Sequence, residues 1–307
     1  MRHFNIIGHK GIFLAISGIL VVAAVAALVL WGLTPGIDFV GGTSWQIKAG
    51  TFAGTTRLTK AALTEFTSQE LRLRDAVILE QSDGSFIVRA KEITEEEHQK
   101  NLVRLREKFG GEELRFETIG AAVGQELRSK ALSVFLLVLV GISLYVTFAF
   151  RKVSYPVRSW KYGVITLLTL FHDAIIPLGV LAFFGRLFGA ELNIASVVAI
   201  LVVMGFSVHD TIVVFDRIRE NLRLRAAHTA EEFDVLVNRS VNETFARSVN
   251  TSLTLVIVLA ALLLFGAAHL RFFTATILIG TIVGTYSSIF IASPLLTLES
   301  RIRTRVN

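Results

Sequence analysis

Six long apolar stretches constrain this chain more than any other feature of its sequence. A bilayer core about 30 Å thick is crossed by about 20 apolar residues in an α-helix. The stretches that reach or approach this length are residues 11–33, 131–150, 162–184, 192–215, 248–268 and 272–296. With 52% hydrophobic residues and a mean hydropathy of +0.60, the sequence predicts an α-helical integral membrane protein with six transmembrane helices.

The basic residues predict how these spans are oriented. Lys and Arg gather before the first span and in alternate connections after it, whereas the short connections on the other side hold only Arg186 and Arg271. The positive-inside rule therefore places both termini in the cytoplasm. The formal net charge of +6 is then a signal of topology, and it argues against a nucleic-acid partner.

A cleavable signal peptide is the alternative interpretation of the first stretch, because residues 24–26 resemble a cleavage site. The apolar core of a signal sequence is about 7 to 15 residues long. The apolar run here is longer, so we favour an uncleaved anchor.

The only long polar segment, residues 34–130, holds 14 basic and 15 acidic residues, and is large enough to form a domain. Its pattern predicts the order β-α-β-β-α-β, which is typical of a ferredoxin-like α+β fold. The expected elements are strands at 43–48, 76–80, 86–90 and 114–119, helices at 58–71 and 95–109, and a hairpin turn at 82–85. The predicted domains are therefore 1–33 (cytoplasmic N-terminus and first helix), 34–130 (external, periplasmic) and 131–307 (helices two to six with cytoplasmic loops and C-terminus).

Ionisable residues inside spans cost about 2.5 to 3.5 kcal/mol each and commonly mark a pathway or an internal pair. Asp173 lies near the middle of the third span, beside His172 and on the same helical face as Thr166, Thr169 and Pro177. A carboxylate in such a place can load and release a proton. A histidine beside an aspartate is more often a packed hydrogen-bonding partner than a relay, and this applies to His172 and to His209.

Two further spans carry polar stripes, so we expect a hydrated seam between helices three, four and five. The fourth-span stripe comprises Asn193, Ser196, Ser207, Asp210, Thr211 and Arg217, and the fifth-span stripe comprises Arg247, Asn250, Thr251 and Thr254. An ion pair between Asp210 and Arg247 that forms and breaks with protonation is one hypothesis. A fixed structural pair, or a snorkelling charge at Arg247, is the alternative.

Two other patterns predict packing. Gly280, Gly284 and Ser288 recur every four residues in the sixth span, which is typical of a close helix contact. The charged connection between Asp216 and Glu243 is interpreted as an interfacial amphipathic helix, with an apolar side formed by Ile218, Leu222, Leu224 and Ala226.

Absent motifs narrow the chemistry. There is no cysteine, which excludes disulfides and thiolate metal sites. The sequence also lacks a P-loop, a dinucleotide fingerprint, a zincin motif and a nucleophile elbow, so neither an enzymatic activity nor a cofactor or metal is expected. The glycines after Asp38 could form a phosphate loop, but we favour a turn that enters a strand.

Three blocks resemble a known family. Residues 36–43 (GIDFVGGT) are similar to the segment after the first helix of SecD and SecF proteins, and residues 205–221 (GFSVHDTIVVFDRIREN) closely resemble the fourth-span signature of the SecF family. Residues 242–254 (NETFARSVNTSLT) are similar to the start of its fifth span. The resemblance covers nearly the whole chain in order.

The resemblance implies one half of a resistance-nodulation-division transporter: a SecF-type subunit that pairs with SecD and assists protein translocation through SecYEG at the bacterial inner membrane. It implies H⁺ as the coupling ion, with Na⁺ as the alternative, an unfolded polypeptide as the substrate, and YajC and YidC as further candidate partners besides membrane lipids. The resemblance implies Asp210 as a proton-pathway carboxylate and Arg247 as the charged partner of Asp210 or of a SecD carboxylate. Together with the candidates from the polar stripes, the predicted proton pathway comprises Asp210, Arg247, Asp173, His209 and His172, supported by Ser207, Thr211, Asn250, Thr251 and Thr254.

Two other functions stay open. The chain could be a scaffold for SecD without an ion pathway of its own, or half of a small-molecule or lipid exporter of the same superfamily. The polar stripes argue against a pure scaffold, and the single small external domain argues against an exporter.

Overall fold

The computed structural model describes residues 4–48, 50, 58–71, 73, 75–81, 84–151, 157–225 and 229–298. These residues form two compact units. One unit comprises Thr34–Leu132 together with Glu191–Ile194, and the other comprises the rest of the described chain. We call them the α+β unit and the helical unit.

The helical unit contains long apolar helices that confirm the six predicted spans. Their bounds are α1 (Lys10–Trp31), α5 (Ala121–Ala149), α6 (Ser159–Phe188), α7 (Ile194–Leu224), α8 (Ala230–Phe265) and α9 (Arg271–Ser287), with a π-helical turn after α9 at Ser288–Ala292 and a helical end to 298. α5 starts in the α+β unit and continues into the helical unit.

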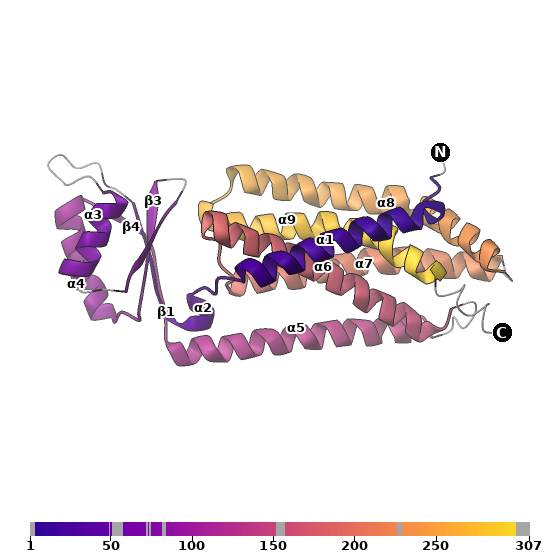
Figure 1. The fold of residues 1–307 in the computed structure, drawn as a ribbon, viewed down its shortest axis with the longest axis horizontal. Helices are drawn as coiled ribbons and strands as arrows, with labels where there is room; N and C mark the ends of the chain where they lie inside the picture. The colour runs from indigo at the N-terminus through magenta and orange to yellow at the C-terminus, as the bar shows by residue number, and fades with distance from the viewer. Residues whose placement is uncertain are drawn as a thin grey trace. The chain divides into compact units, whose positions relative to one another are not determined.

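α6 and α9 form the centre of the helical unit. In both helices 61% of the apolar window is buried, against 17% in α1, 11% in α5 and 17% in α8. α6 packs against α1 and α9, and α9 packs against α8, as the ribbon of Figure 1 shows. Polar residues on α6 and α9 are thus removed from lipid, whereas the apolar windows of α1, α5 and α8 are mostly exposed.

The predicted interfacial helix between Asp216 and Glu243 is wrong. α7 continues to Leu224 and α8 already begins at Ala230, where Thr229 and Glu232 form a capping box. Ile218 is fully buried inside the helical unit, whereas Leu224 is exposed, and Ala226 lies outside the described residues. The charged residues do not mark a surface helix, because Arg217 on α7 forms an ion pair with Glu243 on α8.

The α+β unit contains the predicted strand and helix order. A four-stranded antiparallel sheet has the order β2-β3-β1-β4, which confirms the ferredoxin-like topology. Its strands are β1 (Gly42–Lys48), β2 (Val77–Glu80), β3 (Ser85–Ala90) and β4 (Glu112–Ile119), and its helices are α2 (Ile37–Val40), α3 (Lys60–Glu65), continued by a π-helical turn at Phe66–Glu70, and α4 (Glu95–Phe109). Of the predicted turn, residues 82 and 83 lie outside the described part.

Local chemistry explains these elements. Thr94 and Glu97 form a capping box that starts α4, and Gly110 ends the helix with a positive φ of 60°. Side chains from β1, α3 and α4 fill the core, including the fully buried Trp45 and Phe109.

Candidate functional site: a polar seam between helices

Two glycines of α9 bring this helix against α7. A Cβ at Gly280 would lie 2.3 Å from Cγ2 of Val203, and a Cβ at Gly284 would lie 2.9 Å from Cβ of Ser207. The predicted close contact is therefore confirmed. The approach brings hydroxyl groups of α7 and α9 to a carboxylate of α6.

That carboxylate is Asp173, which is fully buried. Its Oδ2 accepts hydrogen bonds from the hydroxyl of Ser287 on α9 (2.7 Å) and from that of Ser207 on α7. Its Oδ1 lies 2.8 Å from Nδ1 of His172. Asp173 thus joins three helices through one side chain, and each contact replaces part of the hydration that the carboxylate has lost.

The other residues predicted around Asp173 play smaller parts. Thr166 and Thr169 are buried, but their hydroxyls donate to carbonyls of their own helix, at Tyr162 and Ile165. Nε2 of His172 is buried without a hydrogen-bond partner in the described chain. His172 therefore has one nitrogen on Asp173 and one available for another group.

Asp210 is also buried, with 3% of the residue exposed, but its surroundings differ. Its Oδ2 has no hydrogen-bond partner among the described residues. The polar groups around this carboxylate are the hydroxyl of Ser248 on α8, the hydroxyl of Ser288 after α9, and the exposed His209. Asp210 therefore faces hydroxyls of two helices, with one carboxylate oxygen left unpaired in the described chain.

Several hydroxyls near this seam are also buried without a hydrogen-bond partner in the described part of the chain. Thr211 on α7, Ser248 on α8 and Thr281 on α9 each have a buried Oγ without a hydrogen-bond partner in the described part of the chain. An unsatisfied buried polar group costs about 1–3 kcal/mol, and native proteins commonly satisfy such groups with ordered water. These atoms are consistent with the predicted hydrated seam.

A charged network fastens the end of α7 to the start of α8. Arg217 Nε donates to Glu243 (2.7 Å), and Arg217 Nη1 donates to Glu220 (2.6 Å). Glu243 also accepts from Asn221 (2.9 Å) and Arg239 (2.8 Å). This network explains why Arg217 is not part of the buried stripe on which the sequence pattern placed it.

A polar cavity of about 340 Å³ lies beside this network, lined by Val213, Asp216, Arg217, Glu220, Glu243, Thr244 and Arg247. Arg247 is exposed and makes no ion pair among the described residues. Asp210 and Arg247 do not pair in the described chain, because one is buried and the other lies on the exposed face of α8. Arg247 therefore lines this cavity without an ion-pair partner in the described chain.

Within the described chain, the buried polar face of α8 differs from the face that the sequence pattern predicted, and the role of that predicted face stays a prediction. Asn250, Thr251 and Thr254 are exposed, and the hydroxyls of Thr251 and Thr254 donate to carbonyls of their own helix. The buried polar residues are Ser248 and Ser252, and Ser252 accepts a hydrogen bond from Thr285 of α9 (2.6 Å). The spacing of four between these two serines was the signal that could have identified the face.

The structure also places the remaining residues of the α7 stripe and one serine of α9. Ser196 is buried on α7, as the predicted stripe requires, but Asn193 lies just before α7 begins. Ser287, which donates to Asp173, was missed because it lies outside the small-residue repeat of Gly280, Gly284 and Ser288. The described residues contain no cluster of three or more His, Cys, Asp or Glu that could hold a metal ion.

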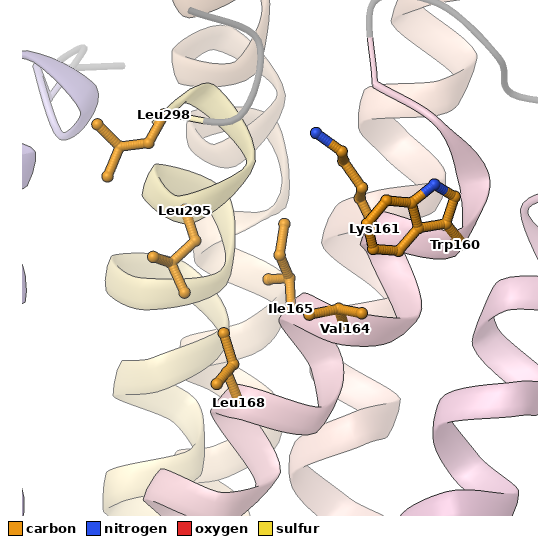
Figure 2. Close-up of a pocket in the computed structure, with 7 residues that line it drawn as sticks. All are labelled: Trp160, Lys161, Val164, Ile165, Leu168, Leu295 and Leu298. Carbon is orange, nitrogen blue, oxygen red and sulfur yellow. The ribbon is translucent and has the colours of Figure 1, made fainter. Parts of the chain in front are cut away.

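A separate apolar groove of about 130 Å³ lies between the start of α6 and the helical end after α9. Figure 2 shows its lining residues, Trp160, Lys161, Val164, Ile165, Leu168, Leu295 and Leu298. The Lys161 ammonium lies 5.7 Å from the centre of the Trp160 ring. None of the seam carboxylates lines this groove, so it belongs to the apolar periphery.

Comparison with known proteins identifies the family and the fold. The family model described as "Protein export membrane protein SecD/SecF, C-terminal" matches residues 99–301. The protein translocase subunit SecF of Thermobaculum terrenum is 39% identical over 302 residues, covering 95% of this chain and 92% of the relative. The chain belongs to the SecF family of protein translocase subunits. The SecF subunit of Anaerolinea thermophila is 33% identical, covering 96% of this chain and 93% of the relative.

Two solved SecDF structures resemble the whole chain. SecDF of Thermus thermophilus, a translocon-associated membrane protein, has a TM-score of 0.80 and 34% identity, covering 97% of this chain and 38% of that chain. SecDF in a super-membrane-facing form has a TM-score of 0.69 and 32% identity, covering 100% of this chain and 40% of that chain. The chain thus spans less than half of the length of the SecDF chains. It is a multi-pass membrane protein with a role in protein translocation.

Proposed function

We propose that this chain is a proton-coupled SecF subunit, which works with a SecD partner and the SecYEG channel to assist the translocation of unfolded polypeptides. The observation that carries the proposal is Asp210, a buried carboxylate with an oxygen unpaired within the described chain. A charged group inside a membrane helix is costly, and binding a proton removes that cost. H⁺ is the proposed coupling ion because a single carboxylate can carry it.

We assign proton transfer to Asp210. Asp173, with His172 as its neighbour, is assigned to hold α6, α7 and α9 together. Arg247, which lines a polar cavity and has no ion pair in the described chain, is assigned to a carboxylate of the partner subunit. The proposed location is the bacterial inner membrane, with both termini in the cytoplasm and the α+β unit on the outer side.

The energy available is sufficient to move a helix between two packed positions. One proton crossing a potential of 100 mV supplies about 2.3 kcal/mol, and this shifts a two-state equilibrium several tens-fold. We infer that loss of charge at Asp210 changes how α7 packs against α8 and α9. That movement would act on the α+β unit, which would hold the emerging polypeptide.

A scaffold function is the second candidate, and one observation favours it. The apolar windows of α1 and α5 are only 17% and 11% buried within the chain, so both helices offer surface for another membrane protein. A scaffold needs these surfaces but does not need Asp210.

The test compares Asp210→Asn with Asp75→Asn, the same substitution at a side chain of the α+β unit that is 69% exposed. Each variant replaces the endogenous protein in cells, and precursor secretion, membrane level and co-purification of SecD are measured. We expect Asp210→Asn to lose at least about tenfold in secretion with normal level and assembly, and Asp75→Asn to retain it. Full secretion with Asp210→Asn would overturn the proton-coupled function and favour the scaffold.

A further inference from the structure

The residues Gly36–Gly42 lie where three distant parts of the chain meet. The segment includes the short helix α2 and leads into β1. It contacts the residues just before α7, the first turns of α5 and the end of β3. All of these contacts lie within the α+β unit, because Glu191–Ile194 belongs to that unit.

The first contact fixes the start of α7. Asp38 Oδ2 accepts a hydrogen bond from the backbone N–H of Ile194, the first residue of α7, at 2.7 Å. This N–H has no acceptor within its own helix, and a carboxylate is favoured at the positive end of a helix dipole. A residue far away in sequence thus supplies the cap of α7.

The connection between α6 and α7 is held from two more directions. The N–H of Gly36 donates to the carbonyl of Leu192 (2.7 Å), and the N–H of Leu192 donates to the carbonyl of Thr34 (2.8 Å). Arg89 of β3 forms an ion pair with Glu191. Side chains of both charged residues are only 20% exposed, so this pair is less screened by solvent than a surface pair.

The glycines make the remaining contacts possible. Gly41 has a φ of +78°, and a Cβ there would lie 2.6 Å from Cα of Ala121 at the start of α5. A Cβ at Gly42 would lie 2.7 Å from the carbonyl oxygen of Ala90, which ends β3. Larger residues at either position would force α5 or β3 away from the segment.

We propose that the Gly36–Gly42 segment is a joint that transmits movement of α7 to the sheet of the α+β unit, with Asp38, Arg89 and Glu191 as its positioning residues. The inference rests on the proposed function, because α7 is the helix that carries Asp210. α7 is one continuous helix from Ile194 to Leu224, so a shift at Asp210 reaches Ile194 along a rigid element. Asp38 then passes that shift to α2 and β1.

The first test compares Asp38→Ala, which removes the acceptor, with Asp38→Asn, which keeps a carbonyl oxygen for the Ile194 N–H. The chain has no cysteine, so spin labels attach only at introduced ones: Gln99→Cys on α4 with Arg223→Cys on α7. The labelled chain is reconstituted with its partner in liposomes, and the distance between the labels is measured with and without a proton gradient. Secretion is measured in cells.

We expect the gradient to shift this distance in the parent and in Asp38→Asn. In Asp38→Ala the shift disappears and secretion falls about tenfold, while membrane level and partner assembly stay normal. An unchanged shift and unchanged secretion in Asp38→Ala would overturn the joint. So would the absence of a shift in the parent while Asp210→Asn still abolishes secretion, an outcome that leaves the proposed function standing.

A charge swap keeps the proposal testable if Asp38→Ala fails to assemble. Arg89→Glu and Glu191→Arg each place two like charges together, and the double variant restores an ion pair with the opposite polarity. We expect each single variant to lose the gradient-dependent shift and the double variant to regain it. Failure of the double variant to regain the shift, at normal membrane level, would overturn the role of this pair.

Discussion

The two buried carboxylates of the seam lie on neighbouring helices but have opposite surroundings. Asp173 accepts hydrogen bonds from Ser207 and Ser287 and contacts the ring of His172, whereas Oδ2 of Asp210 has no hydrogen-bond partner in the described chain. Both residues are almost completely buried, so burial alone does not distinguish them. The difference lies in the donors that neighbouring helices supply.

This difference indicates that the two buried carboxylates have different roles. A carboxylate bound by α7 and α9 stabilises one arrangement of those helices, and protonating it would disturb several hydrogen bonds at once. A carboxylate with one oxygen unpaired has fewer such contacts to lose, so it can change its charge at a smaller cost to the packing around it. We therefore infer that Asp173 fixes the seam and that Asp210 is the group free to change.

The largest predicted effect comes from truncating Asp173. Asp173→Ala leaves the hydroxyls of Ser207 and Ser287 and the ring of His172 without their acceptor. Hydrogen bonds between membrane helices contribute about 0.6–1.7 kcal/mol each, so we expect a loss of about 2–5 kcal/mol in unfolding free energy. Unfolding in lipid nanodiscs measures it.

The matched control is Asp210→Ala, which removes a buried carboxylate of the same size. We expect it to change the unfolding free energy by less than about 1 kcal/mol, because no hydrogen bond to Oδ2 is lost. Equal destabilisation by the two variants would contradict the division of roles.

The spans and the α+β unit could be predicted because their signals are local. An apolar run of sufficient length has few alternatives to a membrane helix, and the strand and helix order follows from alternation, Thr94 and Gly110. The faces of α8 could not be predicted in this way. Ser248 and Arg247 are neighbours in sequence, and only the packing of α9 decides that Ser248 is buried and Arg247 exposed.

Hydropathy also failed where charges pair with each other. The segment from Asp216 to Glu243 is polar enough to suggest a surface helix, but Arg217 and Glu243 neutralise one another across α7 and α8. Such a pairing depends on two helices that meet in space, and it leaves no periodicity in either one. The same reason hid the contact between Asp38 and Ile194.

An intermediate effect is predicted at the glycine contact that brings donors to Asp173. Gly284→Val places side-chain atoms where Ser207 already lies, since even a Cβ would be 2.9 Å from the Cβ of that residue. We expect about 1–3 kcal/mol of destabilisation from overpacking, with a lower midpoint of thermal unfolding. The control is Gly141→Val on α5, where a Cβ would meet no atom within 4 Å; a similar loss there would show that glycine flexibility rather than the contact is responsible.

The smallest predicted effect compares two fully buried serines. Ser287 donates to Asp173 at 2.7 Å, whereas the hydroxyl of Ser248, near Asp210, has no hydrogen-bond partner in the described part of the chain. Ser287→Ala should therefore cost about 0.6–1.7 kcal/mol, and Ser248→Ala should cost almost nothing, although the two substitutions remove the same atom at equal burial. Both values come from the unfolding assay used for Asp173→Ala. If Ser248→Ala proves as costly as Ser287→Ala, then Asp210 is fastened as firmly as Asp173, and the distinction between a fixed and a changeable carboxylate fails.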